Sequence, residues 1–296
     1  MTISNSTRSI ETIDAKEDFE LIKIDESSYK GKYPLKKPTA KHRGVYGGNL
    51  VGQGLLVAIL SSPNSIPHSL HSYFVRPVND ESEITWKIEK ISNGRNYSNR
   101  LIKGYQNGKM VYVLNASLTK PKSSSSFEYH EEQDQQFSDQ SKAKYWQKNN
   151  KIRIETKRFE ANTNKDSFNW LMRYGIQNEQ KITGIDETFK YVILSILTDW
   201  KNLQMILKEN ENVNNGANEY FLTNPKFNVS MDHSIYFHDD DFDPTDWLNF
   251  QAKCTRISHD RALIIAEIYN INGKHVATII QERLYVIDEE AMKAKL

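Results

Sequence analysis

The chain has 296 residues, of which 38% are hydrophobic and 26% are charged, and its mean hydropathy is -0.67. This length suits two domains of about 150 residues each, and the composition is that of a soluble globular protein, not of a disordered chain. The 39 basic and 38 acidic residues give a net charge of +1, so no strong overall field attracts nucleic acid or a membrane surface. We therefore expect no nucleic-acid partner.

The cysteine content and the lengths of the apolar runs exclude further classes of protein. Cys254 is the only cysteine, which excludes an internal disulfide and a multi-cysteine metal site, and fits a reducing compartment. The longest apolar runs, residues 55–60 and 191–197, are far shorter than the about 20 residues that a membrane helix needs. Residues 1–18 are polar and acidic, unlike a secretory signal or a transit peptide. We predict no membrane span.

In chain order, the first predicted element is a helix over residues 49–60, which follow a cluster of glycines. Residues 84–88 then alternate between apolar and polar side chains, as in a strand with one buried face. The runs 96–106 and 109–119 flank Asn107-Gly108, a pair that favours a type I′ hairpin turn. This half of the chain therefore predicts one helix followed by a meander of antiparallel strands.

The second half repeats this order. Residues 188–205 are apolar on nearly every side, which predicts a buried helix. The runs 261–271 and 275–285 flank Asn272-Gly273, which predicts a second hairpin of the same kind. Three short matches recur in order at displacements of 162, 166 and 165 positions: residues 71–74 with 233–237, 91–92 with 257–258, and 107–109 with 272–274.

These patterns indicate a duplication. A helix wrapped by an antiparallel sheet is the layout of a hotdog domain, and two in tandem predict an α+β double hotdog. We predict one copy at residues 19–120, a polar solvated linker at 121–159, a second copy at 160–288 and a tail at 289–296.

The glycine cluster at residues 44–54 invites comparison with phosphate-binding loops. It lacks the Gly-Lys-Ser/Thr ending and the strand spacing of a dinucleotide fold, so nucleotide hydrolysis and Rossmann binding are poorly supported. The cluster favours close packing at a helix start, where free backbone N–H groups can also receive a carbonyl or phosphate oxygen. Gly47 and Gly48 are therefore candidate substrate-binding positions, with packing alone as the alternative.

Four segments carry a family resemblance, namely residues 45–53, 68–77, 231–238 and 276–282. They resemble the type II acyl-CoA thioesterase family, which includes bacterial enzymes and peroxisomal enzymes of fungi and animals. The resemblance implies a double hotdog that hydrolyses fatty acyl-CoA to free acid and CoA by direct attack of water, in fatty acid metabolism. It implies no metal and no other cofactor.

The resemblance also implies three catalytic residues. A carboxylate at Asp199, a hydroxyl at Ser230 and an amide at Gln281 would position and activate the water. Without the resemblance, Asp199 reads as a helix-end cap, Ser230 as an ordinary strand serine and Gln281 as an outward strand residue. No Gly-x-Ser-x-Gly motif marks Ser230 as a covalent nucleophile.

Further candidates surround this set. Aligning His71 with His233 places His68 opposite Ser230, which makes His68 a candidate for substrate binding, with a structural role as the alternative. Arg76 is a candidate for compensating the phosphate charge of CoA. Strand periodicity puts His233 on the face opposite Ser230, which excludes an Asp-His-Ser triad from neighbouring positions, and no ligand spacing indicates a metal.

The last three residues, Ala294, Lys295 and Leu296, form a tripeptide of the type that the peroxisomal import receptor binds. Together with the family resemblance, they predict a peroxisomal matrix protein with that receptor as a partner. Two rivals stay open: a hotdog enoyl-CoA hydratase, whose Asp-x-Asn-Pro-x-His signature is absent, and a non-catalytic acyl-CoA-binding protein. The sequence leaves acyl chain length open, and it leaves open whether the chain forms a homo-oligomer.

Overall fold

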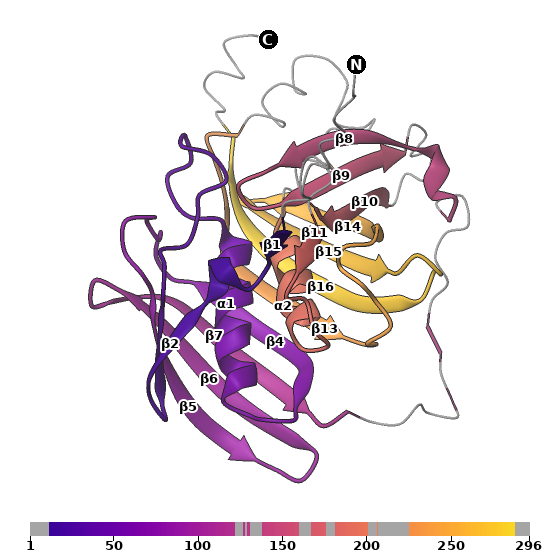
Figure 1. Cartoon of the computed structure of the whole chain (residues 1–296). Helices are drawn as coiled ribbons and strands as arrows, with labels where there is room; N and C mark the ends of the chain where they lie inside the picture. The colour runs from indigo at the N-terminus through magenta and orange to yellow at the C-terminus, as the bar shows by residue number, and fades with distance from the viewer. Residues whose placement is uncertain are drawn as a thin grey trace, which may run out of the picture.

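The computed structural model describes residues 12–121, 127, 129–130, 138–159, 167–175, 181–200, 206 and 225–287. Two halves follow each other along the chain, each with one helix against an antiparallel sheet (Figure 1). This is the predicted double hotdog architecture. None of the helices in the described segments is long and apolar enough to cross a membrane.

The two long helices are α1 (Gly47–Leu60) and α2 (Phe189–Leu197), and short 3-10 turns are η1 (Glu17–Phe19) and η3 (Gln140–Lys142). The first half contains β1 (Thr12–Asp14), β2 (Leu21–Asp25), β3 (Ser28–Gly31), β4 (Ile66–Phe74), β5 (Thr85–Asn93), β6 (Tyr97–Gln106) and β7 (Lys109–Thr119). The second contains β8 (Ala143–Asn149), β9 (Ile154–Phe159), β10 (Phe168–Tyr174), β11 (Lys181–Thr183), β12 (Phe227–Ser230), β13 (Asp232–Phe237), β14 (Leu248–Ser258), β15 (Arg261–Tyr269) and β16 (His275–Val286).

One continuous sheet joins the halves. Its strand order among the described residues is β2-β3-β5-β6-β7-β4-β13-β16-β15-β14-β10-β9-β8, and β12 pairs with β16 beside β13. Outward from the central β4–β13 pair, each first-half strand of this sheet has a counterpart in the second half, such as β7 with β16 and β2 with β9. Strands β1 and β11 pair with each other in a separate two-stranded sheet. The strand order therefore supports the duplication inferred from the sequence.

The register corrects the alignment of the two copies. His71 is exposed, whereas His233 is fully buried, so the two histidines face opposite sides of the sheet. His71 instead pairs directly with Ser234 across the junction, and these two positions are equivalent. Because side chains alternate along a strand, the one-residue slip in the sequence alignment exchanged the two faces.

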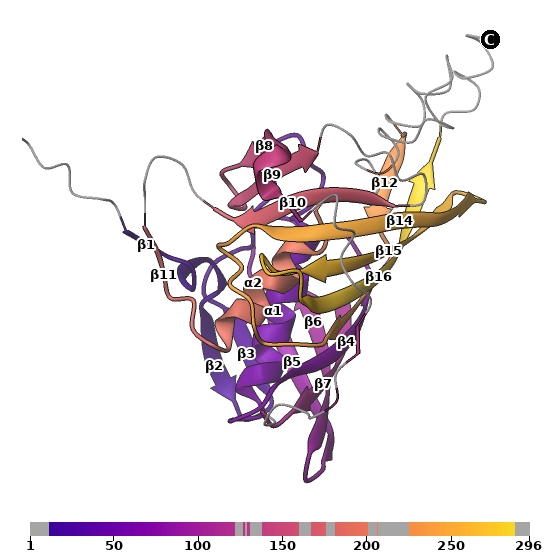
Figure 2. The same cartoon turned by 90° about the vertical axis from the view of Figure 1, so that its right-hand side faces the viewer.

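The helices lie side by side inside the curved sheet (Figure 2). Every residue of α2 from Phe189 to Leu197 is buried, as its all-round apolar sequence predicted. Glycines on α1 allow the close approach: a Cβ at Gly52 would lie 2.7 Å from Ile196 Cγ1, and a Cβ at Gly48 would collide with the Ile196 carbonyl oxygen. The Tyr46 hydroxyl donates to that same carbonyl at 2.6 Å, just before α1 begins.

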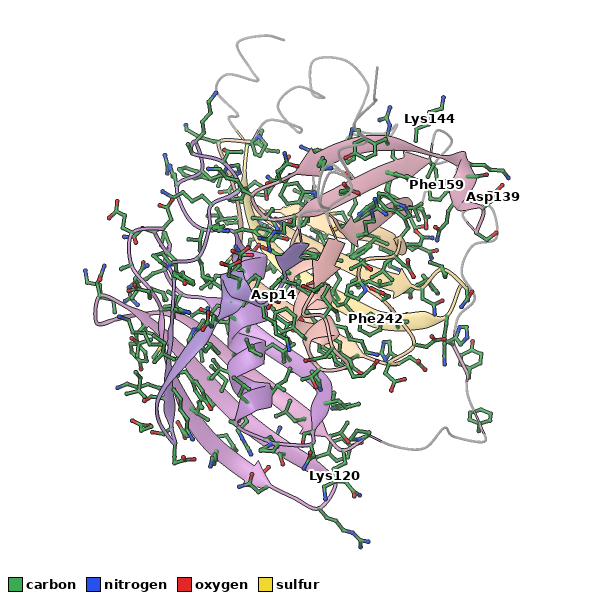
Figure 3. The ribbon with its side chains drawn as sticks, in the orientation of Figure 1. Asp14, Lys120, Asp139, Lys144, Phe159 and Phe242 are labelled. Atoms are coloured by element: carbon green, nitrogen blue, oxygen red, sulfur yellow. The ribbon has the colours of Figure 1, made fainter. Side chains whose placement is uncertain are left out.

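The predicted linker is wrong in its later part. Residues 143–159 contain β8 and β9, which continue the sheet beyond β10, and Figure 3 places Lys144 and Phe159 in this region. Their charged residues made the segment look solvated, yet the charges pair across strands: Glu155 is 2.8 Å from Lys148 and 2.7 Å from Arg173. The second copy therefore starts before residue 160, at β9.

Two smaller expectations also change. Asn107 and Gly108 both have positive φ, as a type I′ turn requires, whereas only Gly273 does so in the second hairpin. There, the Asn270 side chain accepts from the backbone N–H groups of Asn272 and Lys274, which stabilises a longer turn. Helix α2 ends at Leu197, and residues 201–205 of the longer predicted helix lie outside the described residues.

Replacement of Gly48 by alanine tests the helix contact. Alanine improves helix propensity by about 1 kcal/mol, but the added methyl must displace a backbone carbonyl, so we expect a net loss of about 2 kcal/mol in the free energy of unfolding. Gly54→Ala is the matched control, because its Cβ would meet only side-chain atoms, at 3.3 Å. Urea unfolding of both variants is the measurement, and equal stability would contradict the packing role of Gly48.

Candidate active site

The candidate site forms where the end of α2 meets the start of α1. Thr198 directly follows the last residue of α2, and its hydroxyl donates to the Ser195 carbonyl at 2.8 Å. Asp199 follows directly and is 6% exposed. A Cβ at Gly47 would collide with Asp199 Oδ2 and would lie 3.1 Å from Phe74 Cε1, so only glycine fits there. The carboxylate therefore lies against the positive end of α1.

Two further predicted residues reach the same carboxylate. Ser230, at the end of β12, donates from its hydroxyl to Asp199 Oδ1 at 2.7 Å. Gln281, in the middle of β16, donates from Nε2 to the same oxygen at 2.6 Å and to Ser230 Oγ at 3.1 Å. Three residues distant in sequence thus meet, as the family resemblance implied.

A change of register explains how Ser230 reaches the interior. Ser230 pairs with Arg283 on β16, but Ser234 pairs with Ile280, so one extra residue is accommodated between the two pairings. Such a bulge re-aims side chains. Ser230 and His233 consequently both face inward, contrary to the simple alternation expected from the sequence.

No triad results from this arrangement. The His233 Nε2 atom contacts the Thr198 hydroxyl at 2.7 Å, while Asp232 accepts from the Glu282 backbone N–H at 2.7 Å. Because the Thr198 proton goes to Ser195, His233 must donate from Nε2, which leaves Nδ1 unprotonated. Nδ1 is buried and lacks a partner in the described part of the chain. An Asp232-His233-Ser230 triad is therefore excluded because His233 and Asp232 bond to other partners, not because His233 and Ser230 face opposite sides of the strand.

Sequence reasoning missed Arg283. Its guanidinium is buried on β16, and Nη1 donates to Ser230 Oγ and to Gln281 Oε1, both at 3.0 Å. The same nitrogen is 3.5 Å from Asp199 Oδ1, and Nε donates to Asn228 Oδ1 at 2.7 Å. Its spacing of two residues from Gln281 on a strand was the one available signal, since i and i+2 share a face.

The side chains of Asp199 and Arg283 are both largely buried. Burial lowers the pKa of the Arg283 guanidinium, and the Asp199 carboxylate opposes that shift. Burial also raises the pKa of the Tyr46 hydroxyl well above its usual value, with a further contribution from Asp199. Burial lowers the pKa of His233 to about 4, an effect that Arg283 adds to and Asp199 opposes. The Asp199 and Arg283 side chains therefore face each other beside two buried groups, Tyr46 and His233, whose charged forms burial disfavours.

The structure does not bring His68 or Arg76 to this group. His68 is exposed, its Nδ1 contacts the Ser117 hydroxyl at 3.2 Å, and its ring packs against Tyr97. Arg76 is exposed and donates to the Met110 carbonyl at 2.6 Å. The predicted targeting residues, Ala294, Lys295 and Leu296, lie outside the described residues.

The corrected alignment identifies the equivalent place in the first copy. Pro67 pairs with Leu118 just as Ser230 pairs with Arg283, and Ala116 corresponds to Gln281. Ser62 follows α1 by two residues, as Asp199 follows α2. Of these first-copy residues, Pro67, Ala116 and Leu118 are apolar and only Ser62 is polar. The first copy therefore lacks side chains that could form the hydrogen bonds seen among Asp199, Ser230, Gln281 and Arg283.

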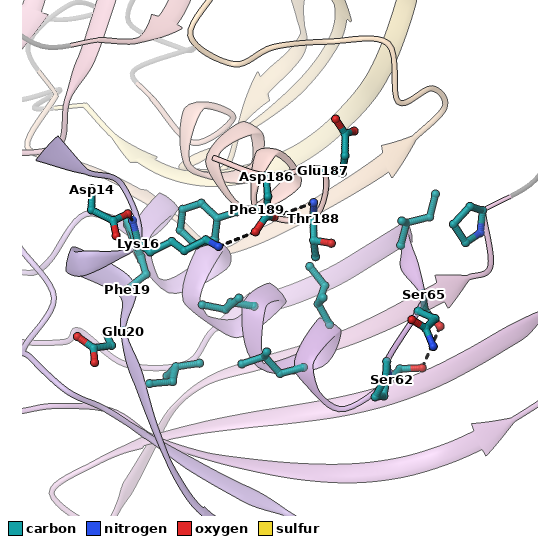
Figure 4. A pocket seen from close by; sticks show the side chains of 18 of the residues that line it. Asp14, Lys16, Phe19, Glu20, Ser62, Ser65, Asp186, Glu187, Thr188 and Phe189 are labelled. Carbon is teal, nitrogen blue, oxygen red and sulfur yellow. Dashed lines mark hydrogen bonds and ion pairs between the residues drawn. The ribbon is translucent and has the colours of Figure 1, made fainter. Parts of the chain in front are cut away.

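A groove of about 1100 Å³ opens near that equivalent place, at the end of the helix pair remote from Asp199. Its lining includes Phe189 at the start of α2 (Figure 4). Leu60 at the end of α1 also lines it. Lys16 and Asp186 form an ion pair across it. No predicted catalytic residue lines the groove, so the volume of a cavity does not locate the candidate site. Among the residues that the structure describes, no cluster of histidine, cysteine and carboxylate side chains could hold a metal ion.

Comparison with known proteins agrees with this architecture. Residues 35–120 match the family described as the acyl-CoA thioesterase N-terminal domain, and residues 188–285 match the acyl-CoA thioesterase C-terminal domain. The two matched ranges cover most of both copies in the expected order. The chain belongs to the type II acyl-CoA thioesterase family.

Individual relatives differ in how much of their length matches this chain. Peroxisomal acyl-coenzyme A thioester hydrolase 1 of Saccharomyces cerevisiae is 34% identical over 95 residues, which are 32% of this chain and 27% of the yeast protein. The chain thus matches only about a quarter of that relative's length. Acyl-CoA thioesterase 2 of Haemophilus influenzae is 26% identical over 288 residues, 91% of this chain and 96% of the relative. The crystal structure of an acyl-CoA thioesterase II from Mycobacterium marinum superposes with a TM-score of 0.68 at 18% identity, covering 93% of this chain and 99% of that one, which supports the double hotdog fold.

The buried histidine predicts a specific pH dependence. The pKa of His233 falls from 6.5 to about 4 on folding, so between these values the unfolded chain binds a proton that the folded chain does not. Stability from this group is therefore lost as the pH falls through that window, by about 1.4 kcal/mol per pH unit.

His233→Gln retains a donor for Thr198 and does not titrate. We expect its free energy of unfolding to decline less than that of the wild type between about pH 6.5 and about pH 4, as measured by urea unfolding. His238, whose pKa burial also lowers to about 4, is present in both proteins and cancels from the comparison. Parallel pH profiles would contradict the neutral, buried state of His233.

Proposed function

We propose that the protein hydrolyses fatty acyl-CoA thioesters to a free fatty acid and CoA. One observation carries the proposal: Asp199, just after α2, meets Ser230 of β12 and Gln281 of β16 at the start of α1. The family membership and the full-length similarity to a protein named acyl-CoA thioesterase 2 support the same reaction.

In the proposed mechanism, water attacks the thioester carbonyl directly. The hydrogen bonds that Asp199 receives end on Oδ1, whereas Oδ2 faces Gly47. We assign Oδ2 the role of accepting the proton of the attacking water. The new C–O bond forms a tetrahedral oxyanion, the C–S bond then breaks, and the departing CoA thiolate takes the proton from Asp199. No covalent acyl-enzyme is needed.

The start of α1 supplies groups for the oxyanion. No side chain among the described residues caps this helix, and the Asn49 N–H already donates to the Tyr46 carbonyl. We assign the backbone N–H groups of Gly47 and Gly48 to the thioester oxygen, since such groups and the helix dipole favour developing negative charge. Gly48 would then serve both packing and binding. Arg76, an exposed residue two positions after the end of β4, stays a candidate for the CoA phosphates.

The proposed function and its two rivals differ in the products that an assay would detect. A hydratase would add water across a C=C bond without releasing thiol, and a binding protein would do neither. The family match covers both copies and disfavours the hydratase. Thiol release from purified protein separates all three, and a series of acyl-CoAs of graded length gives the chain-length preference.

The first functional prediction concerns the three converging side chains. Asp199→Asn retains size but removes the base, so turnover should fall by about 100-fold or more. Ser230→Ala and Gln281→Ala should also be severe, and a double variant should be little worse than the worse single variant, because the groups act on one water. Thiol release is the readout.

Two matched controls lie outside the proposed site. Asp186→Asn changes a carboxylate at the opposite end of α2, where Asp186 accepts from the Thr188 and Phe189 N–H groups. Ser234→Ala changes a serine on the outer face, bonded to His71. Both controls should retain wild-type turnover. Retention of more than about a third of turnover by folded Asp199→Asn would overturn the assignment of the base.

We also propose that the protein acts in the peroxisomal matrix, bound during import by the receptor for C-terminal tripeptides. Support comes from Ala294, Lys295 and Leu296, and from the name of the yeast relative. The bacterial relative, which matches much more of the chain, carries no such location in its name.

Removal of Leu296 tests the location. With a fluorescent tag on the N-terminus, the full chain should appear in peroxisomes, and the shortened chain should appear in the cytosol with its thiol-release activity unchanged. Peroxisomal fluorescence of the shortened chain would contradict the role of the tripeptide.

A further inference from the structure

A buried arginine touches every member of the proposed catalytic group. Arg283 lies directly opposite Ser230 in the β12–β16 pairing and is 8% exposed. Its Nη1 atom is 3.0 Å from Ser230 Oγ, 3.0 Å from Gln281 Oε1 and 3.5 Å from Asp199 Oδ1. The first copy has Leu118 at the equivalent place, so this contact belongs to the second copy alone.

The donor and acceptor pattern follows from Arg283. A guanidinium can only donate, so the Gln281 amide must turn its oxygen toward Arg283 and its Nε2 toward Asp199. Ser230 Oγ accepts from Arg283 and from Gln281, which leaves its single proton for Asp199. Every hydrogen bond around the carboxylate thus has one direction.

Asn228 orients the guanidinium in turn. Its side-chain oxygen accepts from Arg283 Nε at 2.7 Å, and it lies two residues before Ser230 on the same strand. Orientation by a fixed acceptor matters because the arginine side chain has many rotamers and its charge is effective only in one place.

Charge gives a second reason for this arrangement. Asp199 and Arg283 have side chains that are 5% and 9% exposed. A carboxylate in such surroundings is costly unless a partner charge compensates it, and removal of one partner from a buried pair is strongly destabilising.

We propose that Arg283 is a positioning residue of the hydrolase, which sets the hydrogen-bond directions of Ser230 and Gln281 and balances the charge of Asp199. This inference rests on the proposed function. It predicts that Arg283 determines the rate of the chemical step, because a misdirected Gln281 amide would present its oxygen to the carboxylate.

The kinetic test uses three variants at this site and a control. We expect Arg283→Met to lower kcat by about 100-fold while KM changes by less than about threefold, and Arg283→Lys to recover part of kcat through its charge. Asn228→Ala should cause a smaller loss of kcat. Arg100→Met is the control: Arg100 is 2% exposed and bonded to Ser61 and Asn93, in the first copy, so its loss should leave kcat unchanged.

A stability measurement tests the pair without using activity. Arg283→Met should lower Tm, and addition of Asp199→Asn should raise Tm again, because the unbalanced carboxylate is then absent. If Arg283→Met proves too unstable for kinetics, Arg283→Lys and Asn228→Ala provide the kcat comparison. A failure of the wild-type protein to release thiol would overturn the proposed function, whereas the Tm comparison would still report on the pair.

Two results would overturn the inference. One is a folded Arg283→Met protein with kcat within about threefold of the wild type. The other is a Tm for the Asp199→Asn, Arg283→Met double variant no higher than that of Arg283→Met. Either result would mean that Arg283 does not position the proposed catalytic residues and balance the charge of Asp199 as proposed.

Discussion

The close antiparallel approach of α1 and α2 is the constraint on which the rest of the structure depends. Gly48 and Gly52 let the backbone of α1 reach Ile196, and this contact brings the end of one helix to the start of the other. Asp199 consequently lies against Gly47 without any long loop. A single packing contact therefore stabilises the core and also places a carboxylate beside free backbone N–H groups.

Because the architecture is duplicated, the end of one helix meets the start of the other at two places. Only one of these places has the polar side chains of the proposed site. At the Asp199 end, β12 and β16 contribute Ser230, Gln281 and Arg283. The equivalent positions of the first copy are Pro67, Ala116 and Leu118, which can donate nothing from their side chains. The first copy instead supplies the helix start that the Asp199 site requires. Each half thus contributes groups to the one proposed site.

Sequence patterns predicted the parts of the fold that local chemistry determines. The Asn107-Gly108 turn, the buried helix at residues 189–197 and the long strands β6, β7, β15 and β16 all follow from turn preference or periodicity. Strands β8 and β9 were missed because charged residues such as Lys148 and Glu155 make the segment polar. Only the folded sheet reveals that Glu155 pairs with Lys148 and with Arg173 of β10.

The same limit applies to the site. Asp199, Ser230 and Gln281 could be named through the family resemblance, although local spacing alone gave them ordinary roles. Arg283 was missed because its partners meet it only through the pairing of β12 with β16. The alignment of His71 with His233 was wrong because a one-residue slip leaves the sequence match intact while it exchanges the faces of a strand.

Direct attack by water, activated by one buried carboxylate, is the central claim of this account. Single-turnover hydrolysis of a long-chain acyl-CoA in H₂¹⁸O, with enzyme in excess and mass spectrometry of both the fatty acid and the intact protein, tests it most directly. The account predicts ¹⁸O in the fatty acid from the first turnover and no acylated protein at any time. An acyl adduct on the protein, or first-turnover fatty acid without ¹⁸O together with ¹⁸O in the Asp199 carboxylate, would contradict it.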